Sequence, residues 1–258
     1  MMKLREKTPR EALKKAIRGE LAPEALQHKV LSLIFEDHYL QEHLVLKGGS
    51  FLSTVYGSPR ASKNDLDLSV TSAVDADRIT EKVKRVAVQV TSDNPELSWR
   101  MINGHHLSFK KNGNELLAVQ VQLNRPILRP VREVTLRFGS HSSAKVSTIS
   151  INEQLAEKID ALDKRANEGK KLNDIHDIYF MIRKGAQFDV ALIAAKLNIS
   201  NSTEAKKAIE DILINNLADE NMRRLWNSHT MTILNTPEFE VVADTILSAW
   251  LSTASRAA

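Results

Sequence analysis

Two aspartates, Asp65 and Asp67, stand one residue apart in the segment Asp-Leu-Asp-Leu-Ser-Val, where polar and apolar residues alternate. This alternation predicts a β-strand, and on a strand both carboxylates point to the same face. Two carboxylates so close together repel each other unless a cation lies between them. Oxygen ligands of this kind suit Mg²⁺, whose shell is usually completed by water and substrate phosphates. The pair therefore predicts a magnesium site.

A glycine pair and a serine, Gly48-Gly49-Ser50, precede the aspartates. They interrupt a short apolar run that we interpret as a buried strand, and a helical pattern follows them as far as Gly57. Glycines let the backbone approach a phosphate, a helix N-terminus offers free N–H groups, and the serine hydroxyl adds a donor. This segment can hold a triphosphate while the aspartates hold its metal, which is the equipment for nucleotidyl or phosphoryl transfer.

Each half of this arrangement also has a plainer explanation. The glycine pair alone could be a tight turn, and Asp65 and Asp67 alone could lie on a solvated strand face. The order strand, glycine pair, helix, loop and aspartate pair is more specific than either half. We therefore interpret the combination as a functional site.

Four charged residues further along the chain have spacings that place them on shared helix faces. Lys158 and Arg165 are seven residues apart, and Asp174 and Asp177 are three apart on the next expected helix. They could be ion pairs that clamp two helices together. Alternatively, Lys158 could bind a nucleotide phosphate while Asp174 orients the substrate or Lys158 itself. The spacing alone does not choose between these readings.

The segment at 46–68 reads LKGGSFLSTVYGSPRASKNDLDL and resembles motif I of the polymerase-β-like nucleotidyltransferases. Its residue pattern is similar to that of the AbiEii/AbiGii-type toxin family, which includes the MenT toxins. A second similarity covers 157–165 and 173–179, with Asn173 where the family usually has an arginine. Together the two similarities span residues 44–183. The family positions that match are Arg60, Ser62, Asp65, Asp67, Lys158, Arg165, Asp174 and Asp177.

The resemblance implies a Mg²⁺-dependent nucleotidyltransferase toxin that moves a nucleotide from a nucleoside triphosphate to RNA, notably the tRNA 3′ end, and releases pyrophosphate. It also implies an antitoxin partner and a role in a toxin–antitoxin or phage-defence system. Asp65, Asp67, Lys158 and Asp174 are the expected catalytic residues, and the two former hold the metal; Asp177 we interpret as more structural. Expected nucleotide contacts are Lys47, Gly48, Gly49, Ser50, Arg60 and Lys158.

The motif does not distinguish acceptors, and one group typical of the superfamily is missing. An enzyme acting on a small molecule or a protein hydroxyl therefore remains an alternative. Polymerase-β-like enzymes usually place a third acid on a nearby strand, and we align that position with Gln122. Glutamine cannot act as a general base. Either the alignment slips, Asp174 substitutes, two acids suffice, or the chain is a non-catalytic binder of nucleotide or RNA.

The expected fold class is α+β: a polymerase-β-like nucleotidyltransferase domain with a mixed sheet over 1–150, then a helical domain over 151–258 that completes the cleft. A change of pattern near residue 150 marks this boundary, and two Asn-Gly pairs predict hairpin turns. Expected strands are 44–46, 65–70, 97–102, 107–110, 116–123, 131–138 and 146–151. Expected helices include 23–41, 75–90, 189–197, 203–217, 219–227 and 238–253, the last opened by Pro237.

The composition narrows the function classes further. The 258 residues include no cysteine, which excludes a disulfide scaffold and a cysteine nucleophile and fits a cytoplasmic protein. No secretory signal or membrane-length apolar run is evident, and His105-His106 lacks the acidic partner of a metal site. A net charge of +4 mildly favours a polyanionic partner. Basic candidates for RNA contact are Arg125, Arg129, Lys164 and Arg165, and the basic segment at 1–20 is either a solvated helix or a nucleic-acid-binding arm.

Overall fold

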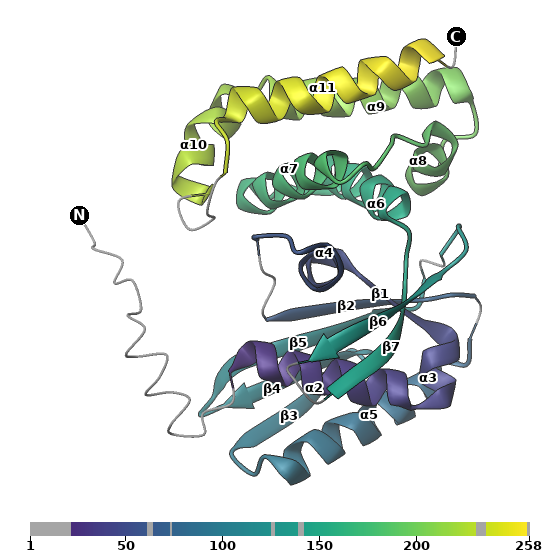
Figure 1. Ribbon diagram of the computed structural model, residues 1–258, viewed down its shortest axis with the longest axis vertical. Coiled ribbons are helices and arrows are strands. Elements are labelled where there is room, and N and C mark those ends of the chain that lie inside the picture. Colours follow the sequence, from purple (N-terminus) through teal and green to yellow (C-terminus); the bar gives the residue numbers. More distant parts are fainter. Residues whose placement is uncertain are drawn as a thin grey trace.

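The computed structural model describes residues 22–60, 64–72, 74–124, 127–138, 142–230 and 236–256. The predictions for the N-terminal basic segment, Ser62 and Arg125 lie outside these residues. Within them, seven strands form one mixed sheet in the order β3-β4-β5-β2-β1-β7-β6. The α+β class predicted from the sequence is confirmed (Figure 1).

The strands follow the predicted hairpins and alternating patterns closely, with one shift. Ser150 accepts a hydrogen bond from the Glu153 N–H and caps the next helix, so the last strand ends at Thr148 instead of running to 151. The bounds are β1 Leu44–Lys47, β2 Asp65–Val70, β3 Leu97–Ile102, β4 His106–Lys111, β5 Asn114–Gln122, β6 Arg132–Phe138 and β7 Ser142–Thr148.

The N-terminal half contributes the helices α2 to α5. The single helix expected over 23–41 is instead two helices, because the Asp37 side chain accepts hydrogen bonds from the Tyr39 and Leu40 N–H groups and starts a new one. Gly57 ends α4 with a φ of 70°, as a left-handed cap. The bounds are α2 Pro23–Glu36, α3 His38–His43, α4 Gly48–Tyr56 and α5 Ala76–Asp93.

From residue 151 the described chain is helical. The prediction that two domains meet near residue 150 remains a prediction, although α6 begins there. The last helix begins at Phe239, two residues after the predicted opening proline. The helices are α6 Ile151–Lys164, α7 Glu168–Arg183, α8 Val190–Leu197, α9 Ser202–Leu217, α10 Glu220–Thr230 and α11 Phe239–Arg256. Among the described helices, none combines the length and apolar character needed to cross a membrane.

The two faces of the sheet differ in character. Leu66, Leu68 and Val70 alternate with Asp65, Asp67 and Ser69, and the three apolar residues are buried in the core. The apolar face continues across β5, β4 and β3. α5 packs against β3, and α2 packs against β5 and α5. On the opposite, polar face, α4 packs against β1 and β2. Figure 1 shows α6 to α11 stacked beyond α4, at the end of the molecule away from β3 and β4.

Candidate active site

The two aspartates lie on the polar face of β2, in the middle of the sheet. The strand is formed as predicted, with Asp65 exposed and Asp67 half-buried. The register sets Lys47 of β1 on one side of Asp67 and Gln120 of β5 on the other. Neither aspartate forms an ion pair within the described residues. The aspartate pair is thus a negative centre without a direct ion-pair partner in the described part of the chain.

Gly48 begins α4 directly against the Asp67 carboxylate. It adopts a φ of 73°, and a Cβ atom built on it would lie 2.2 Å from Asp67 Oδ2. Its N–H donates to Gln154 Oε1 of α6 at 2.6 Å. A side chain at this position would force the carboxylate aside. The glycine is therefore required by the position of Asp67, a reason that differs from the phosphate approach expected from the sequence.

Gly49 and Ser50 are buried in the first turn of α4. The Ser50 hydroxyl donates to the backbone carbonyl of Asp65 and accepts from Gln27 Nε2 at 2.9 Å. Gln27 Nε2 also lies 2.9 Å from the same carbonyl. These bonds fasten the start of α4 to the start of β2. Ser50 therefore holds the two halves of the motif in register.

Lys47 lies at the centre of a buried polar cluster. Its Nζ is 2.6 Å from Glu157 Oε2 and 2.8 Å from Gln122 Oε1. Lys196 of α8 lies 3.1 Å from Glu157 Oε1 and 2.8 Å from Glu153 Oε1. Burial by itself would raise the pKa of Glu157, but Lys47 and Lys196 outweigh it and lower that pKa. The cluster joins β1 to α6 and α8.

Lys158 lies in a second buried cluster, where α6 meets α7. Its Nζ is 2.7 Å from both Asp174 Oδ1 and Asp177 Oδ2. Burial would lower the pKa of Lys158, but the carboxylates of Asp177 and Asp174 outweigh it and raise that pKa. Arg165 Nε lies 2.6 Å from Asp174 Oδ2, and Arg60 Nε donates to Asp177 Oδ1 at 2.8 Å. The ion-pair clamp considered from the spacing is therefore present, and Asp177 is as central to it as Asp174.

The charges of the aspartate pair and of the Lys158 cluster influence each other's pKa values. Burial raises the pKa of Asp67; Lys158 opposes this and Asp65 adds to it, so the pKa stays above its usual range. Burial would lower the pKa of Arg60, but Asp177 raises it, with smaller contributions from Asp174 and Asp65, so that pKa is raised overall. Residues of α6 and α7, far along the chain, thus shift the pKa values of Asp67 and Arg60.

The donor set suits a divalent cation that takes its remaining ligands from elsewhere. Asp65 and Asp67 offer two carboxylates on one face. Burial raises the pKa of Asp67 and Asp65 adds to this, and a bound cation would favour the ionised form. Mg²⁺ commonly binds one or two carboxylates and keeps water and phosphate ligands. Among the described residues, no group of three or more histidines and acids could hold a metal ion. The site therefore fits Mg²⁺ together with a phosphate ligand.

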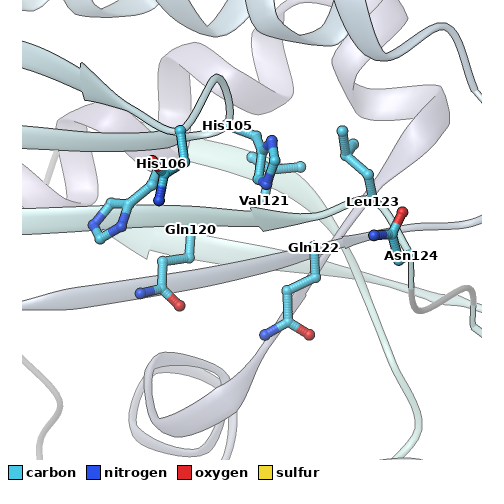
Figure 2. A pocket seen from close by; sticks show the side chains of 8 residues that line it. His105, His106, Gln120, Val121, Gln122, Leu123 and Asn124 are labelled. Carbon is cyan, nitrogen blue, oxygen red and sulfur yellow. The ribbon is translucent and has the colours of Figure 1, made fainter.

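The strand register shows which glutamine of β5 lies beside Asp67. Gln120, rather than Gln122, lies directly beside Asp67, while Gln122 lies beside Ser69 and accepts a hydrogen bond from Lys47. Figure 2 shows the amides of Gln120 and Gln122 on the same side of β5. Both positions hold glutamine, so β5 supplies no carboxylate beside Asp67.

The basic residues expected to contact RNA have protein partners. Arg129 pairs with Asp189 at the start of α8, Lys164 pairs with Asp160 within α6, and Arg165 pairs with Asp174. Sequence reasoning missed Gln154, Glu157 and Lys196. Glu157 adjoins Lys158 in the second family-like segment, which could have drawn attention to it, whereas nothing in the sequence singles out Lys196.

His176 and the two tryptophans belong to the core of the helical region. The imidazole of His176 stacks on Trp226 with ring centroids 6.3 Å apart, and its Nδ1 lies 3.8 Å from Asp177 Oδ1. Trp226 and Trp250 are fully buried. The contacts of His176 therefore support a packing role.

Comparison with known proteins shows which family this chain belongs to and which solved structures it resembles. Residues 29–245 match the family described as "Nucleotidyl transferase AbiEii toxin, Type IV TA system". MenT4, a nucleotidyltransferase toxin from Mycobacterium tuberculosis H37Rv, has a similar fold at 15% identity and a TM-score of 0.51, over 93% of this chain and 98% of that one. An antigenic nucleotidyltransferase-like protein from Paracoccidioides brasiliensis aligns at 21% identity and a TM-score of 0.46, over 74% of this chain and 94% of that one. No curated protein sequence matches this chain. Because the family match covers most of its length, the chain belongs to the AbiEii family of nucleotidyltransferase toxins of type IV toxin–antitoxin systems.

Proposed function

We propose that the protein transfers a nucleotide from a nucleoside triphosphate to a hydroxyl group of RNA, with the tRNA 3′ end as the acceptor. The observation that carries this proposal is that α6 packs against the residues beside Asp67: the Gly48 N–H donates to Gln154, and Lys47 pairs with Glu157, the neighbour of Lys158 in the chain. In this arrangement the charge of Lys158 acts on Asp67, and the charge of Asp65 acts on Arg60. Carboxylates for a metal and cations for phosphates are the two components that nucleotidyl transfer needs.

Each residue then has a distinct task. Asp65 and Asp67 would hold Mg²⁺, which when bound neutralises charge on the phosphates. Gly49 and the first turn of α4 present backbone N–H groups to the triphosphate. Lys158 and Arg60 attract its negative charge, and Asp174 keeps Lys158 in place.

The reaction balances as a single displacement. The acceptor hydroxyl oxygen forms a bond to the α-phosphorus, and the bond from that phosphorus to the bridging oxygen breaks. Pyrophosphate leaves with the electron pair of that bond. The hydroxyl proton passes to water, because β5 presents the Gln120 amide where an acid would otherwise stand.

Lys47, expected from the sequence to contact nucleotide, takes a positioning role in this proposal. Its ammonium group is held between Gln122 and Glu157, away from solvent. It lies beside Asp67 in the sheet and so contributes positive charge next to the aspartate pair. We also propose, from the family, that a cognate antitoxin restrains the protein and that it acts in the cytoplasm.

A labelling experiment tests the proposal and separates its rivals. The protein is incubated with Mg²⁺, total tRNA and each α-³²P-labelled nucleoside triphosphate in turn. Label on tRNA is the expected result. Label on a small molecule or a protein would point to another acceptor, and nucleotide binding without any transfer would point to a non-catalytic binder. Asp67→Ala should abolish labelling, while Asp244→Ala, a change on the exposed face of α11, should not.

A further inference from the structure

A pocket of about 500 Å³ lies one strand away from Asp67, where the β3–β4 hairpin ends and β5 continues past it (Figure 2). Its volume is in the range of sites for small ligands. The described residues that line it include amides and imidazoles but no carboxylate, lysine or arginine. Its polar lining consists of Asn103, His105, His106, Gln120, Gln122 and Asn124. Such a pocket suits an uncharged ligand that both donates and accepts hydrogen bonds.

The strand register places two of the lining residues near the candidate active site. His106, Gln120 and Asp67 are direct neighbours on three adjacent strands and share the polar face. Adjacent strands lie about 5 Å apart, so the row from Asp67 to His106 spans about 10 Å. Gln120 is exposed although its strand is central in the sheet. A ligand in the pocket can therefore reach the atoms above Asp67.

One of the lining residues has a polar atom with no partner in the described part of the chain. The Nε2 atom of His106 is shielded from solvent and makes no hydrogen bond there. A buried polar atom of this kind costs free energy unless a ligand or water satisfies it. The pocket thus combines space, exposed amides and an unsatisfied ring nitrogen.

The geometry of the proposed reaction gives this pocket a role. The start of α4 lies on the β1 side of Asp67, and the pocket lies on the β5 side. In phosphoryl transfer the attacking and leaving oxygens are roughly in line. If the triphosphate binds at α4, pyrophosphate departs on that side and the attacking hydroxyl enters from the β5 side. This step rests on the proposed function.

We propose that the pocket beside Gln120 and His106 receives the base of the terminal nucleoside of the acceptor RNA. The amide groups and the imidazole can hydrogen-bond to the edge of a base. A base can enter only when it is neither paired nor stacked in a duplex, so the acceptor is a single-stranded RNA end. The hydroxyl of that nucleoside then lies over Asp67.

Two basic residues extend this acceptor site along the same face of the sheet. Arg100 of β3 is exposed and Lys110 of β4 is half-buried. The register pairs Arg100 with Ser108 and Ser98 with Lys110, so both side chains share the face of His106. Their charges suit the phosphates of the preceding nucleotides. This places the path of the RNA on β3 and β4 and away from Arg129 and Lys164, which were expected to bind it.

A cross-linking experiment on the wild-type protein tests the proposal without requiring catalysis. A short single-stranded RNA with 4-thiouridine at its 3′ end is irradiated with the full chain in the absence of nucleotide. Cross-links within residues 98–124 are expected. Cross-links confined to α6–α11, or none at all, would overturn the inference. Because the wild-type chain is used, the result holds even where a variant fails to fold.

Two paired variants sharpen the test. His106→Ala combined with Gln120→Ala should raise KM for the RNA about tenfold and leave nucleotide affinity unchanged. Unchanged KM would contradict the pocket assignment. Wild-type protein that neither binds nucleotide nor labels RNA would instead refute the proposed function, so the two failures are distinguishable.

The charge assignment has a matched control on the other face of the sheet. Arg100→Glu with Lys110→Glu should weaken RNA binding about tenfold or more and reduce its salt dependence. Lys84→Glu with Arg85→Glu changes the net charge equally on α5, which packs on the opposite face, and should leave RNA affinity near the wild-type value. Equal weakening by both pairs would mean that only the overall charge matters and would overturn the surface assignment.

Discussion

The aspartate pair and the Lys158 cluster both contain two carboxylates, but only those of the Lys158 cluster are paired with cationic side chains. Asp65 is exposed and Asp67 is half-buried, and neither forms an ion pair among the described residues. In the Lys158 cluster, two buried carboxylates are shared by Lys158, Arg60 and Arg165, so the cluster is compensated with one positive charge in excess. The difference teaches that the carboxylates of the helical region are neutralised within the protein, whereas those of the sheet region have no ion-pair partner among the described residues.

The largest expected effect is the loss of a buried ion-pair partner. Lys158→Met leaves Asp174 and Asp177 in the interior without their shared cation, and the free energy of unfolding should fall by about 3–5 kcal/mol. Urea denaturation of the wild type and of Lys158→Met measures this difference in unfolding free energy. As a control, Arg85→Ala removes a pair with Glu81 on the surface of α5 and should cost about 0.5 kcal/mol or less. Equal losses of unfolding free energy would mean that the Lys158 cluster stabilises the fold no more than a surface ion pair does.

The aspartate pair should respond in activity rather than in stability. Asp67→Asn keeps the shape of the side chain but removes the charge that would hold Mg²⁺, so the labelling rate should fall about 1000-fold, close to 4 kcal/mol in the barrier. The melting temperature should stay the same or rise, because a partly buried charge is lost. Retained labelling, or a large drop in melting temperature, would contradict the assignment of activity to the aspartate pair and of stability to the Lys158 cluster.

Gly48 tests the geometry that joins the two halves of the motif. Gly48→Ala introduces a Cβ against the Asp67 carboxylate at a positive φ, and the unfolding free energy should fall by about 1–3 kcal/mol. Labelling should be lost as well, because the carboxylate must move. Gly113→Ala is the matched control, since its φ is also positive but no atom lies within 4 Å of the added Cβ. The control should lose stability through strain yet retain activity.

The pH dependence of stability should have opposite signs in the two regions. The pKa of Asp177 is well below its usual range in the folded state because Lys158 and Arg60 overcome the effect of burial, so its contribution is present above about pH 4 and lost as pH falls below it. The pKa of Asp67 is raised by burial, so its ionisation costs stability as pH rises above about 4. Melting curves of Asp177→Asn and Asp67→Asn between pH 3 and 7, with a chelator present, should therefore diverge from wild type in opposite directions as pH rises. Parallel curves would contradict this.

The smallest expected effect is stabilisation by the metal itself. At a Mg²⁺ concentration about ten times its dissociation constant, binding should add about 1.4 kcal/mol to the unfolding free energy of the wild type. Asp67→Asn should show no such increase, whereas Asp244→Ala should respond like the wild type. A Mg²⁺ response that survives in Asp67→Asn would place the cation elsewhere.

Local pattern in the sequence determined the arrangement within each element. Alternation placed Asp65 and Asp67 on one face of a strand, and the seven-residue and three-residue spacings placed Lys158 with Arg165 and Asp174 with Asp177. These regularities follow from the geometry of strands and helices, which depends on near neighbours in the chain. The individual strands and the helical region after residue 150 were predictable for the same reason, whereas the mixed sheet was expected from the family resemblance.

Only the tertiary structure decided which faces meet. Lys47 finds Glu157 across 110 residues and Arg60 finds Asp177 across 117, and no local spacing encodes either pairing. Gln120 and Gln122 share a face, so alternation cannot say which of them lies beside Asp67; the register between β2 and β5 does. In the same way, the sequence marks Gly48 as important, but only the packed structure shows that the Asp67 carboxylate occupies the space where its side chain would be.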